Sequence, residues 1–92
     1  MKIKVEYTAH LKRAAGTAEE EIELRTDATL LDALDAVLKR HGGELRRHLQ
    51  DAQGKIHPSL VIAVNGEQVF LESSRELSDG DAIVLLAAIA GG

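Results

Sequence analysis

Hydrophobic and polar residues alternate along two stretches near the N-terminus. In residues 2–8 the odd-numbered positions are mostly apolar, and in residues 19–25 glutamates alternate with aliphatic side chains. A period of two residues is typical of a strand with one buried face. Residues 9–18 break this alternation and contain Gly16, so we expect a loop that joins the two strands into an antiparallel hairpin.

The hydrophobic period changes after Thr29. Its hydroxyl can accept a hydrogen bond from the backbone N–H of Asp32, which is a capping-box-like start to a helix. Basic residues follow near position 40, and Gly42 or Gly43 supplies the helix stop. The apolar residues that recur at spacings of three and four are Leu30, Leu31, Leu34, Val37 and Leu38, so they predict an amphipathic helix with one buried face.

The second half of the chain contains one more short helix and three more strands by the same criteria. Residues 44–50 can form one or two helical turns with their leucines inward. Residues 60–64 are continuously aliphatic, which predicts a strand buried on both faces. Asn65-Gly66 indicates a tight turn into a short strand at residues 67–71. Residues 82–89 have no polar side chain, so we expect a central strand there.

This order of elements predicts an α+β fold, a mixed sheet of four or five strands packed on one main helix. A helix that crosses between two strands of one sheet normally makes those strands parallel. The helix covers one face, and the other face is partly solvated, which accounts for the glutamates of residues 19–25. A length of 92 residues indicates a single domain over residues 1–92.

Composition narrows the function classes. The net charge is -4, and Tyr7 and Phe70 are the only aromatic residues, which argues against direct binding of nucleic acid. The absence of cysteine excludes disulfides, thiol catalysis and zinc-thiolate sites. The N-terminus does not resemble a signal peptide, and no apolar run reaches about 18 residues. We therefore expect a cytoplasmic protein without a membrane segment.

No enzyme site is apparent among the titratable residues. The glutamates at 19–21 indicate a solvated strand edge, and Asp79-Gly80-Asp81 indicates a turn. The four histidines lack the spacing of a helical metal site, so we expect no metal. A basic group could be either a solvated face or a docking surface for an acidic partner; its members are Lys39, Arg40, Arg46 and Arg47.

The end of the sequence carries the clearest candidate chemistry. Two glycines, Gly91 and Gly92, directly follow the apolar strand. A terminal carboxylate is anionic at neutral pH and must be activated before acyl transfer, for example as an acyl-adenylate made with ATP by a partner enzyme. Glycine has no Cβ and a wide range of backbone angles, so a Gly-Gly tail can enter a narrow nucleotide site. We expect a flexible tail at about residues 87–92.

Three features together resemble the ubiquitin-like β-grasp sulfur carriers, the family of the molybdopterin synthase small subunit and the thiamine sulfur carrier. They are the order β-β-α-β-β, the segments Val64-Asn65-Gly66 and Leu77–Ile83 (LSDGDAI), and the ending Ile89-Ala90-Gly91-Gly92. The resemblance covers the whole chain. It implies a non-catalytic carrier that binds no cofactor. Molybdopterin members have two prolines shortly before the glycines, where Ala87 and Ala88 stand here, so a looser tail is expected.

The resemblance also implies a mechanism and partners. An E1-like adenylating enzyme would use ATP to activate the Gly92 carboxylate, and a sulfur donor would convert it to a thiocarboxylate. The large subunit of molybdopterin synthase would then receive the sulfur. Gly91 and Ala90 would thread the partner's channel, and residues 87–89 (Ala87, Ala88, Ile89) would dock partners with the open sheet face. Cysteine synthesis, thiamine synthesis, thiolation of RNA and conjugation to protein lysines through Gly92 are the alternatives.

Overall fold

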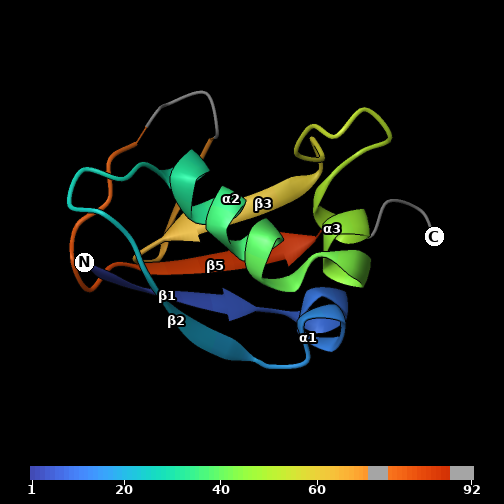
Figure 1. Cartoon of the computed structure of the whole chain (residues 1–92), viewed down its shortest axis with the longest axis horizontal. Helices are drawn as coiled ribbons and strands as arrows, with labels where there is room; N and C mark the ends of the chain where they lie inside the picture. Colours follow the sequence, from blue (N-terminus) through green and yellow to red (C-terminus); the bar gives the residue numbers. More distant parts are fainter. Residues whose placement is uncertain (71–74, 88–92) are drawn as a thin grey trace.

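The computed structural model describes residues 1–70 and 75–87. These residues form five strands and three helices, which are coloured in chain order in Figure 1. The elements are β1 (Lys2–Tyr7), α1 (Ala9–Ala15), β2 (Glu19–Glu23), α2 (Leu30–His41), α3 (Gly43–Leu49), β3 (Leu60–Val64), β4 (Glu67–Val69) and β5 (Ala82–Ala87).

The five strands form one mixed sheet in the order β2-β1-β5-β3-β4. β1 and β5 are parallel, and the other neighbouring pairs are antiparallel. The predicted hairpin, the Asn65-Gly66 turn and the central last strand are therefore confirmed. Figure 1 shows α2 lying across one face of the sheet, as expected for an α+β fold with one main helix.

The hydrophobic core lies between the sheet and α2. Every second residue of β1 and β5 points into it, including Ile3, Val5, Ile83 and Leu85, which are at most 1% exposed. Two burial predictions are wrong. Leu31 is 49% exposed, because it lies at the border of the apolar stripe on α2. β3 is buried on one face only, because no helix of the described residues covers the other face of the sheet.

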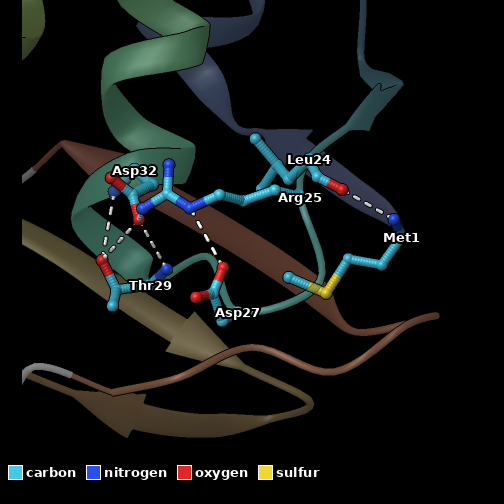
Figure 2. A network of polar contacts seen from close by, with 6 residues as sticks. All are labelled: Met1, Leu24, Arg25, Asp27, Thr29 and Asp32. Carbon is cyan, nitrogen blue, oxygen red and sulfur yellow. Dashed lines mark hydrogen bonds and ion pairs between the residues drawn. The ribbon is translucent and has the colours of Figure 1, made fainter.

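The start of α2 has the predicted capping box (Figure 2). The Thr29 hydroxyl accepts from the Asp32 backbone N–H at 3.4 Å, and the Asp32 carboxylate accepts from the Thr29 backbone N–H at 2.9 Å. That backbone hydrogen bond lowers the pKa of Asp32 below its ordinary value. Arg25 donates to Asp32 at 3.0 Å, so the cap also ties the end of β2 to the helix.

Residues 9–15 form the helix α1, so the prediction of a loop over residues 9–18 is wrong in this part. The segment AHLKRAA is too short to show a helical period, but its three alanines favour helix. Leu11 is fully buried and fixes the helix to the core. Gly16 ends it in the left-handed conformation, at φ 79°, which is the conformation that glycine adopts most easily.

Candidate functional site

The predicted site is the end of the chain, and the structure fixes the strand that leads to it. β5 lies between β1 and β3 and runs parallel to β1. Ala87 is the last residue of β5 and is paired with Leu60, so the first residue of the tail predicted at about residues 87–92 belongs to the strand. The other predicted site residues lie outside the described residues. They are the partner-contact residues Ala88 and Ile89, the threading residues Ala90 and Gly91, and the acyl site Gly92.

Two turns set the register of β5 where it begins. The Asn65 side chain accepts from the Ala82 backbone N–H at 3.0 Å and donates to Asp81 at 2.8 Å. Asp81 also accepts from the Ser78 backbone N–H at 2.8 Å. The V-N-G and L-S-D-G-D-A-I segments thus form one hydrogen-bonded unit. Their role is to position β5 relative to β1 and β3.

The neighbouring residues fix β5 against β1 as well. Asp79 accepts from the Lys2 backbone N–H at 2.7 Å, and Gly80 donates to the Lys2 carbonyl at 2.8 Å. Gly80 has φ +86°, a conformation that a residue with a Cβ adopts only with strain. At the far end of the strand, the Thr8 hydroxyl donates to the Leu85 carbonyl at 3.0 Å. These hydrogen bonds anchor both ends of β5.

The open sheet face, opposite α2, carries an apolar patch over β3 and β5. We define this patch as Val61, Ala63, Val84 and Leu86. Its members are cross-strand neighbours, since Val61 is paired with Leu86 and Ala63 with Val84. Leu86 is 43% exposed and stands directly before the end of β5. The other three members are half-buried, and a partly exposed cluster of aliphatic side chains of this kind is suited to docking a protein.

The same face is charged over β1 and β2. Lys4 lies between Glu6 and Glu19, at 3.4 Å and 3.1 Å. Glu21 and Glu23 are also exposed on the edge strand β2, which confirms the prediction of a solvated strand edge. The open face therefore has an apolar half next to the tail and an acidic half away from it.

Glu20 departs from the prediction that the β2 glutamates face outward. It shares the inner face with Ile22, and its side chain is 11% exposed. The carboxylate accepts from Tyr7 and His41 and pairs with Arg40 at 3.1 Å. Burial alone would raise the pKa of Glu20, but the hydrogen bonds from Tyr7 and His41 and the nearby Arg40 guanidinium outweigh it and lower the pKa. The cluster joins β1, β2 and the end of α2.

The same cluster changes the acidity of Tyr7. Burial of the phenol, and then its hydrogen bond to the Glu20 carboxylate, raise the pKa of Tyr7. Tyr7 therefore remains neutral and acts as a hydrogen-bond donor at physiological pH. His41, the last residue of α2, lies edge-on to the Tyr7 ring at 5.8 Å between centroids. Tyr7 and His41 are far apart in the sequence, so no local sequence pattern could predict this contact.

The other candidate chemistry is sparse. Within residues 1–70 and 75–87, no group of three or more histidine, aspartate or glutamate residues could hold a metal ion. Ser73 and Ser74 lie outside the described residues. Within the same ranges no helix has the length and apolar character needed to cross a membrane.

Comparison with known proteins agrees with this geometry. The chain is 29% identical to a molybdopterin synthase sulfur carrier subunit of Chlamydomonas reinhardtii over all of both chains. Its fold matches SAMP1, the small archaeal modifier protein 1 of Haloferax volcanii, with a TM-score of 0.89, 26% identity and complete coverage of both chains. A putative molybdopterin converting factor subunit 1 of Pyrococcus furiosus gives a TM-score of 0.77 at 32% identity, covering 97% of this chain and 99% of that one.

These neighbours share the mixed β-grasp sheet described above, and this confirms the predicted fold class. The model of the ThiS family matches residues 5–92, which include every strand from β2 to β5 and half of β1. The chain therefore belongs to the ThiS family of ubiquitin-like sulfur carriers.

Proposed function

We propose that this carrier delivers sulfur as a thiocarboxylate on Gly92, and that its destination is molybdopterin synthesis. The Gly92 carboxylate attacks the α-phosphorus of ATP on an E1-like partner, which forms an acyl-adenylate and releases pyrophosphate. Hydrosulfide from a sulfur donor then displaces AMP and a proton, leaving the thiocarboxylate. The chain itself supplies the acyl group and the docking surfaces, and the partner supplies the nucleotide site.

The position of β5 is the observation that carries this proposal. A central strand, hydrogen-bonded on both sides and fixed by the two turns, holds the start of the tail firmly. The apolar patch beside it lets a partner bind the sheet while the tail enters the partner's site. Binding energy from a remote surface can in this way be used to position a reacting group.

Molybdopterin synthase is the proposed recipient because two similar proteins carry that function in their names. They are the algal sulfur carrier subunit and the putative Pyrococcus converting factor. The large synthase subunit would receive the tail and transfer the sulfur to a pterin precursor. Water would then regenerate the Gly92 carboxylate for another cycle.

Intact-protein mass spectrometry tests the acyl chemistry. The chain is incubated with the E1-like enzyme of its source organism, ATP and sulfide. We expect a mass gain equal to the exchange of one oxygen for sulfur. A chain lacking Gly92 should remain unchanged, and the variant Gln53→Ala, in an exposed loop, is the matched control and should react normally. An unchanged mass of the wild type would refute the proposal.

Conjugation to lysines is the second candidate, supported by the close fold match to the small archaeal modifier protein 1. It uses the same adenylate, but a lysine amine displaces AMP and an amide forms. An assay with cell lysate in place of sulfide distinguishes conjugation to lysines from sulfur transfer. Gly92-lysine adducts found by peptide sequencing would favour the modifier, whereas sulfur in purified molybdopterin would favour the carrier.

A further inference from the structure

A second surface lies at the end of the sheet where β5 ends, and it is basic. α1 contributes Lys12 and Arg13, α3 contributes Arg46 and Arg47, and all four side chains are exposed. The two helices pack against each other there, with His10 of α1 stacked on His48 of α3 at 6.3 Å between ring centroids. We call the four cationic residues the basic ridge.

The four cations of the basic ridge have no acidic partner within the described residues. Lys2 and Lys55 are also unpaired there, whereas the other basic side chains are paired with carboxylates; these are Lys4, Arg25, Lys39, Arg40 and Arg75. Within the described part of the chain, no carboxylate lies within ion-pair distance of any residue of the ridge. Arg46 donates only to the Leu38 carbonyl, at 3.4 Å. In a chain of net charge -4, four neighbouring unpaired cations form a local field of the opposite sign.

This result corrects the basic group that the sequence indicated. Lys39 and Arg40 are paired with Asp35 and Glu20, so they add little to a positive surface. Lys12 and Arg13 belong to the basic surface instead. The sequence did not indicate them, because residues 9–18 were predicted to form a loop. A hollow of about 550 Å³ lies beside these two residues and is also lined by Gly16 and Thr17. It has room for an acidic side chain between the two cations.

The ridge is fixed relative to the end of β5. Thr8, directly before α1, donates to the Leu85 carbonyl of β5, and α1 contacts both β5 and α3. Figure 1 shows α1 and α3 at the end of the sheet toward which the β5 arrow points. A protein that takes up the tail at this end will therefore meet the ridge with the surface around its channel entrance.

We infer that the basic ridge is a docking surface for an acidic rim around the channel entrance of the enzyme that adenylates the chain. The inference rests on the proposed function and adds a second contact to the apolar patch. Charges at the edge of an interface mainly steer encounter and fix orientation. The ridge therefore aligns the tail with the channel, and the apolar patch supplies the buried area.

An acidic protein fits this surface better than a nucleic acid. Nucleic-acid binding without sequence preference combines a long positive groove with aromatic side chains for base stacking. The ridge spans two short helices, and the only aromatic rings on it are the two histidines. The adjacent sheet edge is acidic and would repel a phosphate backbone that extends beyond the ridge.

Steady-state kinetics of adenylation test the ridge. The variant Arg13→Glu/Arg47→Glu is compared with Lys39→Glu/Lys55→Glu, which makes the same charge change at exposed positions outside the ridge. We expect the KM of the adenylating enzyme for the ridge variant to be about tenfold higher than for the wild-type chain at low salt, with kcat unchanged. The control pair should stay within about twofold. The difference should vanish near 1 M salt, where the screening length is about 3 Å.

Two outcomes would overturn the inference: a wild-type KM for the ridge variant at low salt, or an equal increase for the control pair. If the wild type is not adenylated at all, the proposed function fails instead. An NMR titration of the free chain with an oligo-glutamate peptide still tests the ridge, and shifts should centre on α1 and α3. Stronger shifts there with a thymidine oligonucleotide of equal charge would refute an acidic protein as the partner.

Discussion

Glu20 shows how one side chain can join three elements. Its carboxylate receives hydrogen bonds from β1 and α2 while it stands on β2. Each bond to a charged group of this kind contributes roughly 1.5–3 kcal/mol when it is buried. Partial exposure reduces that value here. The sequence predicted that the glutamates of residues 19–23 face outward, because only the fold reveals the partners that make burial of Glu20 favourable.

Replacing Glu20 with glutamine should reduce the free energy of unfolding by about 1–2 kcal/mol at pH 7. The pKa of Glu20 is lowered by folding, so its stabilising effect is complete above the unfolded pKa near 4.3. It is lost as the pH falls through the lower folded pKa. Urea unfolding at pH 7 and at pH 3 should therefore show a gap between Glu20→Gln and wild type that narrows in acid.

The matched control is Glu23→Gln, on the same strand but exposed on the other face. It should change the unfolding midpoint little at either pH. A gap between Glu20→Gln and wild type that widens in acid would contradict our account of the Glu20 cluster.

At the scale of elements, the start of α2 depends on one reciprocal pair. Thr29→Ala removes the hydroxyl that accepts from Asp32 (Figure 2), and should cost about 1 kcal/mol of stability. Thr29→Ser keeps that hydroxyl and should lose much less. Thermal unfolding of the two variants checks this, and equal losses would show that the cap hydrogen bond is not responsible.

Elements with a complete local signal could be predicted from the sequence. α2 has a cap, several turns of periodic leucines and a glycine stop, and β1 and β2 have clean alternation. α1 could not be predicted because it is seven residues long and its only buried side chain is Leu11. A helix of that length is stabilised by tertiary packing rather than by its own sequence. The central place of β5 was visible, since a strand without polar side chains needs neighbours on both sides.

At the scale of the whole molecule, the two proposed docking surfaces combine residues that the sequence does not show as neighbours. The apolar patch combines residues from β3 and β5, and the basic ridge combines residues from α1 and α3. From the sequence, the terminal glycines and the resemblance to a family predict an acyl site at Gly92. The two surfaces could not be predicted, because their members are brought together only by the order of strands and helices.

Leu86→Glu should weaken docking to the adenylating enzyme without destabilising the fold. Leu86 is already 43% exposed, so the unfolding midpoint should change little. Adenylation should nevertheless fall by about tenfold or more, because a buried unpaired charge in an interface costs at least 2 kcal/mol. Leu31→Glu is the matched control, since Leu31 is 49% exposed on the helix-covered side. Equal adenylation by both variants would contradict docking on the open sheet face.

The central position of β5 has a consequence for damaged copies of the protein. β1 and β3 are joined only through β5, so a chain cut before Ala82 is left with two separate hairpins whose edges are unpaired. Isolated hairpins are marginally stable at best. Such a fragment also lacks Val84 and Leu86, half of the apolar patch. We therefore expect that chains cut before Ala82 do not accumulate as folded proteins that could still occupy the activating enzyme, because β5 is needed to complete the sheet.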